Sequence, residues 1–80
     1  MSDVCSPENY ERLEELKRVI NALKGQIDEM EKVGNKEKAS SLRELMEKYK
    51  EQFEDLAGEM YMAGCFDSET MRKLKKQIFG

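Results

Sequence analysis

The tripeptide Val33-Gly34-Asn35 divides the chain into two long stretches in which apolar residues alternate by three and four. Glycine readily takes the left-handed conformation that ends a helix, and asparagine is a favoured N-terminal cap of the next helix. The pattern therefore predicts a helix over 7–33, a turn at 34–35 and a second helix over 36–63.

The apolar residues on the two sides of this turn match when the chain is folded there. Facing positions then have numbers that add up to 69. The resulting pairs are apolar on both sides: Leu13–Leu56, Leu16–Phe53, Ile20–Tyr49, Leu23–Met46, Ile27–Leu42 and Met30–Ala39. Met60 and Ala63 continue the pattern of the second helix. Such spacing is typical of helices that pack knob into hole, so we predict an all-α fold built on a long antiparallel coiled-coil hairpin.

Further cap signals indicate where the remaining helix ends lie. Gly64 is expected to end the second helix, and Asp67 to cap a short helix over 68–79 after a turn at 64–67. A helix of this length is not stable alone. We expect it to dock on the hairpin as a three-helix bundle, or to brace the ends of two hairpins joined as a four-helix bundle. Residues 1–5 lack periodicity and are expected to be a disordered tail, which leaves 6–80 as one helical domain.

The composition narrows the classes of function. Charged and hydrophobic residues each make up 39% of the 80 residues, the net charge is -3, and there is no histidine. An acidic chain is a poor general ligand for nucleic acid. Without histidine the commonest general base and metal ligand is missing, so we predict no catalytic site, no cofactor and no metal site. The polar N-terminal stretch and the lack of a long apolar segment indicate a cytoplasmic protein without a membrane contact.

Two groups of residues are candidates for binding. Apolar residues outside the hairpin seam form the first group, a candidate site for a protein partner: Val19, Leu45, Tyr61, Met62, Phe66 and Phe79. The alternative is that they form a core for the third helix. Because one short helix cannot cover all of them, a homodimer is also predicted. The second group is a basic patch of Arg72, Lys73, Lys75 and Lys76, which is either an ordinary solvated face or a contact for phosphate or for an acidic partner.

The two cysteines, Cys5 and Cys65, are expected at the same end of the hairpin. Residue 5 lies opposite about residue 64 in the folded arrangement, and Cys65 is one position further along. We expect thiols in a reducing cytosol and a disulfide only on oxidation.

The residues around the turn follow the order of a helical-hairpin motif. Ile20, Leu23, Ile27 and Met30 precede the turn, and Glu37-Lys38-Ala39, Leu42-Arg43 and Met46 follow it. Segment 20–46 thereby resembles the UVR motif of bacterial nucleotide-excision-repair proteins and of some protease-system regulators. Lys36 and Ser40 depart from the motif, which usually has an aromatic residue and a second alanine there. The resemblance implies protein–protein binding through the hairpin and no catalysis.

Together these patterns predict a small non-catalytic helical adaptor or regulator that binds a partner protein. The alternatives are an accessory protein that binds nucleic acid through the basic third helix, and a structural subunit of a larger assembly.

Overall fold

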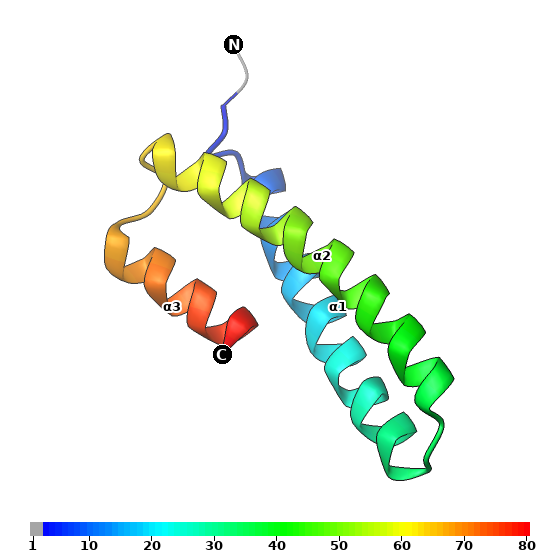
Figure 1. Cartoon of the computed structure of the whole chain (residues 1–80). Helices are drawn as coiled ribbons and strands as arrows, with labels where there is room; N and C mark the ends of the chain where they lie inside the picture. The colour runs from blue at the N-terminus through cyan, green and yellow to red at the C-terminus, as the bar shows by residue number, and fades with distance from the viewer. Residues whose placement is uncertain (1–2) are drawn as a thin grey trace.

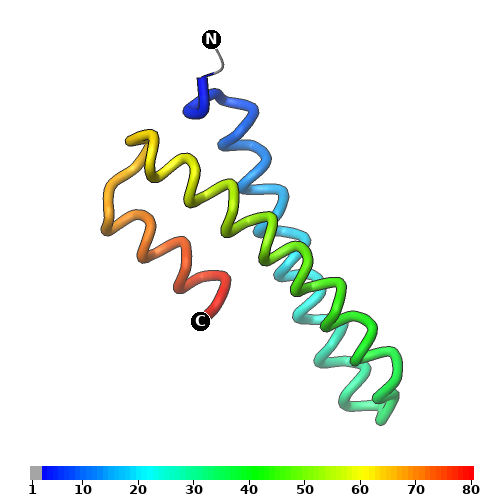
Figure 2. The backbone as a smooth tube through the Cα atoms, turned by 45° about the horizontal axis from the view of Figure 1, so that its top comes forward, coloured from blue at the N-terminus to red at the C-terminus, as the bar shows by residue number. Residues whose placement is uncertain are grey.

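The structure, a computed structural model, describes residues 3–80 and contains three helices and no strand in that range. They are α1 (Pro7–Lys32), α2 (Lys36–Met62) and α3 (Ser68–Phe79). α1 and α2 lie side by side and run in opposite directions, and α3 turns back along one face of this pair (Figure 1). Figure 2 shows the same arrangement from a second direction. The predicted all-α class with three helices is confirmed. α1 and α2 each end one residue before the predicted boundary, which is within the usual uncertainty of helix ends.

The turn between α1 and α2 is built by a glycine cap. Gly34 has a φ of 77°, the left-handed conformation that glycine takes without a steric penalty. The Asn35 N–H donates to the Met30 carbonyl at 2.8 Å, and the Gly34 N–H donates to the Glu31 carbonyl at 3.1 Å. This pair of bonds is a Schellman motif, which satisfies carbonyls at the end of α1. The Asn35 side chain then accepts from the Lys38 N–H and starts α2.

The same device ends α2 and redirects the chain into α3. Gly64 has a φ of 82°. The Cys65 N–H donates to the Met60 carbonyl at 2.9 Å, and the Gly64 N–H donates to the Tyr61 carbonyl at 3.0 Å. Asp67 then caps α3, since its carboxylate accepts from the Thr70 N–H at 2.8 Å. The predicted cap residues therefore carry out the expected roles at both turns.

The core forms one cluster to which all three helices contribute. Its fully buried members are Leu13, Leu16, Ile20, Phe53, Ala57, Met60 and Ile78. On α1 the predicted seam is buried as far as Ile27, and Met30 is half-buried. On α2 the seam prediction is wrong at its end, because Ala63 caps the helix and is exposed. Ala57, outside the predicted seam, is instead 0% exposed, since α3 packs over that side of α2.

The C-terminal end of α3 is held over the groove between the hairpin helices. Ile78 is 0% exposed. The Lys24 ammonium of α1 donates to the Ile78 carbonyl at 2.9 Å, and the Lys50 ammonium of α2 lies 5.5 Å from the centre of the Phe79 ring. A basic side chain is favourable at the negative end of a helix, and a cation is favourable over a ring face. α3 therefore docks on its own hairpin, as in the three-helix arrangement.

Replacing Leu23 by alanine tests the seam. Leu23 is buried between the long helices, so truncation leaves a cavity, and we expect a loss of about 2–5 kcal/mol in the free energy of unfolding. Glu54→Ala on exposed α2 surface is the control and should change stability by about 0.5 kcal/mol at most. Chemical denaturation measures both, and equal losses would contradict the hairpin seam.

The cap of α3 predicts a dependence of stability on pH. Hydrogen bonds from Thr70, first from its side chain and then from its backbone N–H, lower the pKa of the Asp67 carboxyl below its usual 3.8, and the Lys73 charge adds to this. A lowered pKa in the folded state gives stability above the unfolded pKa that is lost as the pH falls through the folded pKa. Unfolding measured from pH 5 to 2 should therefore show a smaller acid-dependent loss in Asp67→Asn, which caps without a charge. Identical pH profiles would refute this role.

Candidate functional site

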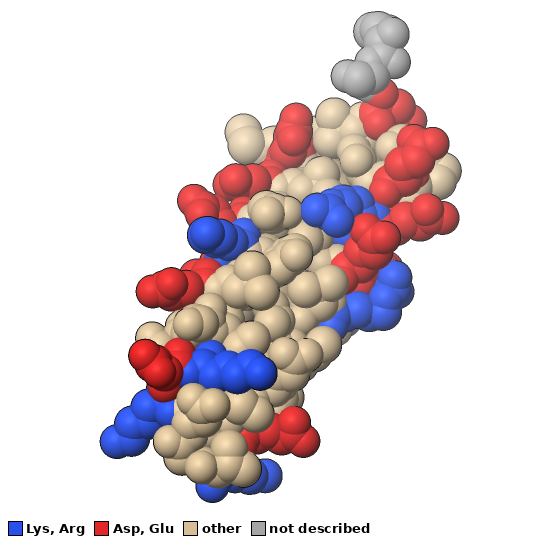
Figure 3. Space-filling model, turned by 90° about the vertical axis from the view of Figure 1, so that its right-hand side faces the viewer, with Lys and Arg blue, Asp and Glu red and all other residues tan. Residues whose placement is uncertain are grey.

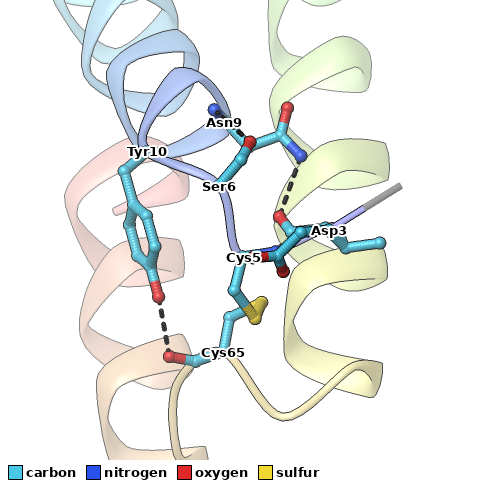
Figure 4. Close-up of a disulfide and its surroundings, with 7 residues drawn as sticks. Asp3, Cys5, Ser6, Asn9, Tyr10 and Cys65 are labelled. Carbon is cyan, nitrogen blue, oxygen red and sulfur yellow. Dashed lines mark hydrogen bonds between the residues drawn. A yellow bond between two sulfur atoms is a disulfide. The ribbon is translucent and has the colours of Figure 1, made fainter. Parts of the chain in front are cut away.

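A disulfide closes the end of the hairpin opposite the Gly34 turn. It joins Cys5, just before α1, to Cys65, just after α2, with a Cα–Cα distance of 5.3 Å (Figure 4). The two residues are 60 positions apart in the sequence. Both cysteines therefore lie at the same end of the hairpin, as the sequence predicts, and a disulfide joins them.

The segment before α1 forms an ordered turn. The Asp3 carboxylate accepts from the Cys5 N–H at 2.9 Å, and the Asp3 carbonyl accepts from the Ser6 N–H at 3.1 Å. The Asn9 side chain donates to the Val4 carbonyl at 2.8 Å, and Val4 packs against the core. The disordered tail predicted for 1–5 thus differs from the structure at 3–5, while Met1 and Ser2 lie outside the described residues. The sequence carried no periodic signal here because these bonds are those of a turn.

Three segments meet at the disulfide end. The Tyr10 hydroxyl of α1 donates to the Cys65 carbonyl at 2.9 Å (Figure 4). The hydroxyls of Tyr61 and Ser68 lie 2.8 Å apart, so the last turn of α2 is tied to the first turn of α3. The rings of Tyr61 and Phe66 are 6.5 Å apart, centre to centre. We call Tyr61, Met62 and Phe66 the corner surface.

The corner surface lies in the longest uncharged run of the chain, Met60-Tyr61-Met62-Ala63-Gly64-Cys65-Phe66. Met62 is 88% exposed and points away from the core. Tyr61 is partly exposed, and Phe66 is half-buried against the core. Because the glycine cap, the disulfide and the Tyr10 bond all act on this segment, an apolar side chain is presented there on a fixed backbone.

The structure does not bring the six candidate partner residues together. Tyr61, Met62 and Phe66 form the corner surface. Phe79 lies at the far end of α3 beneath Lys50. Half-buried Val19 and 42%-exposed Leu45 lie on the long helices, away from both places. Sequence spacing places the hairpin members of this group outside the seam, but the grouping of the six residues depends on which side of the hairpin α3 covers.

The basic patch is exposed along α3. Arg72, Lys73, Lys75 and Lys76 all reach solvent, and Lys73 pairs with Glu69 at 4.0 Å. Arg72, Lys73 and Lys76 line one hollow. The opposite side of α3 packs on the hairpin, where Lys24 of α1 and Lys50 of α2 contact its C-terminal end.

The described residues contain no group of three or more histidine, cysteine, aspartate or glutamate side chains arranged to hold a metal ion. Every buried core side chain in residues 3–80 is hydrophobic. Within the same range, no helix is both long and apolar enough to cross a bilayer.

Comparison of the chain with protein-family models, with curated proteins and with solved structures gave no match in any of the three. The resemblance of residues 20–46 to the UVR motif stays a prediction.

Reducing the disulfide should lower the free energy of unfolding. The bond closes a loop of 60 residues, for which loss of chain entropy in the unfolded state predicts about 4 kcal/mol of stabilisation. Urea unfolding of the oxidised chain, the reduced chain and the Cys5→Ser, Cys65→Ser double variant measures it. The reduced chain and the double variant should agree with each other. Equal free energies of unfolding in all three forms would show that the disulfide does not stabilise the fold.

Proposed function

We propose that this chain is a small non-catalytic helical adaptor or regulator that binds another protein through the corner surface and works as a homodimer. The observation that carries the proposal is the exposure of Met62 within an uncharged run of seven residues, in a chain of which 39% is charged. Apolar side chains held on a rigid backbone are favoured at protein interfaces because little conformational entropy is lost on binding.

The chemistry of the corner surface suits an apolar partner. Methionine adapts its shape to the surface it meets, and tyrosine offers both an apolar ring and a hydroxyl. Acidic residues border the run, Glu59 before it and Asp67 after it. We therefore propose a partner that presents an apolar group flanked by basic side chains.

Several finer expectations belong to the same proposal. We propose coiled-coil packing for the α1–α2 seam, on the basis of the apolar spacing of three and four. The likeness to the UVR hairpin supports protein binding without catalysis. We propose a cytoplasmic location, where the Cys5–Cys65 disulfide of the structure would form only on oxidation and the glycine cap and the Tyr10 hydrogen bond would hold the corner surface in the reduced chain.

A second candidate function rests on the basic face of α3. Four cations within five residues, on an exposed helix, suit the phosphates of a nucleic acid. The overall charge of -3 opposes this function. Titration with salt separates the two candidates, because phosphate binding weakens log-linearly with salt and apolar docking does not. The third alternative, a structural subunit of a larger assembly, would use the same apolar surfaces permanently.

A photoreactive amino acid at position 62 tests the corner surface. We expect it to label one host protein, which, once purified, binds the wild-type chain and binds Met62→Lys at least about tenfold more weakly, since the new ammonium would meet an apolar group and like charges. The matched control is the photoreactive group at Glu51, eleven residues earlier and therefore on almost the same side of α2. Equal labelling from both positions, or unchanged binding by Met62→Lys, would refute the proposed site.

A further inference from the structure

The face of the hairpin opposite α3 carries an uncharged stripe, and we propose that a second copy of this chain docks there. The inference rests on the homodimer of the proposed function and specifies its interface. It concerns a different part of the molecule from the corner surface, so the two sites can be tested separately.

Interactions across the hairpin mark its two faces. Lys24 and Lys50 contact the end of α3 and define the covered face. The Arg12 guanidinium of α1 donates to the Gln52 side chain of α2 at 3.1 Å. Arg12 and Lys24 are twelve residues apart, which is about 120° around a helix. The Arg12–Gln52 bond therefore crosses the hairpin on the face that α3 leaves open.

Helical spacing places further residues on the open face. Val19 follows Arg12 by seven residues, and Leu45 precedes Gln52 by seven. Seven residues are close to two full turns of a helix. Val19 therefore lies on the same side of α1 as Arg12, and Leu45 lies on the same side of α2 as Gln52. Val19 and Leu45, which lie away from the corner surface, are therefore on the same open face of the hairpin.

The stripe continues along both helices. We define the back stripe as Val19, Gln26 and Met30 of α1 with Leu42, Leu45, Tyr49, Gln52 and Leu56 of α2. Its α2 members follow one another by three and four positions, and Leu42, Tyr49 and Leu56 are only half-buried by α1. Figure 3 views the side away from α3 and shows a band of uncharged residues along the hairpin, with charged residues at its edges and basic side chains that reach across it toward each end. A centre with few charges inside a polar rim is the usual layout of a protein interface.

The area of this face suits a weak dimer. From Leu42 to Leu56 the stripe extends over about 21 Å of helix, and two helices packed side by side are about 20 Å wide. Each copy then contributes about 420 Å², and two copies bury about 840 Å², an area typical of weak and reversible interfaces.

A second hairpin fits the stripe better than a single helix would. A lone helix covers the groove between α1 and α2, whereas the back stripe spans both helices along their shared length. A second copy supplies an identical stripe of matching length and width, and the same patch on both sides forms a closed two-fold interface. The stripes then lie inside a four-helix bundle, and each α3 lies on its outer surface.

Sedimentation equilibrium of the full chain with its disulfide intact, from 1 to about 300 µM, tests the interface. We expect a dimer for the wild type and at least about a tenfold weaker dimer for Leu45→Glu, because the new carboxylate would be buried without a partner. Met62→Glu, at the corner surface on the same helix, is the control and should dimerise like the wild type. Gln26→Glu, exposed in the single chain and one heptad after Val19, repeats the test without touching the core. Circular dichroism verifies the helical content of each variant.

Three outcomes would overturn the back-stripe interface. These are a wild type that stays monomeric over the whole range, dimers of Leu45→Glu and Gln26→Glu as tight as the wild type, and a dimer lost in Met62→Glu instead. The proposed adaptor site fails separately, in the labelling experiment at position 62, which Leu45→Glu should leave unchanged.

Discussion

The burial of one apolar stripe of α1 against α2 is the constraint on which the rest of the structure depends. Leu13, Leu16 and Ile20 leave water only if the chain returns alongside itself, so the Gly34 turn must reverse its direction. That reversal brings the start of α1 level with the end of α2, which places Cys5 beside Cys65. It also forms the groove that receives Ile78. The disulfide and the docking of α3 therefore both depend on the packing of α1 against α2.

Local signals in the sequence were sufficient to predict the helices and their caps. Asn35 and Asp67 each accept the expected backbone N–H, because a cap depends only on residues within three positions. Gly34 and Gly64 take positive φ for the same local reason. Of the candidate binding residues, Leu45, Met62 and Phe79 are exposed, whereas Val19 and Phe66 are half-buried.

Features set by α3 could not be predicted from the heptads. The spacing gives the centre of each apolar stripe, but it does not tell which side of that centre a third helix covers. That choice is made by contacts between residues far apart in the chain, such as Lys24 with the Ile78 carbonyl. For this reason the spacing predicts neither the burial of Ala57 nor the separation of the six apolar candidates into different places. It is also why the hairpin has two unequal faces.

The disulfide gives the chain the topology of a lariat. Residues 5 to 65 form a closed covalent ring, and α3 is a tail that leaves the ring directly after Cys65. A protease that cuts the ring at the exposed Gly34 turn opens it without releasing a fragment, because the two arms remain joined through sulfur. A cut after Cys65 instead sheds α3 whole. Nicked and intact molecules therefore have nearly the same mass until a reductant separates the arms.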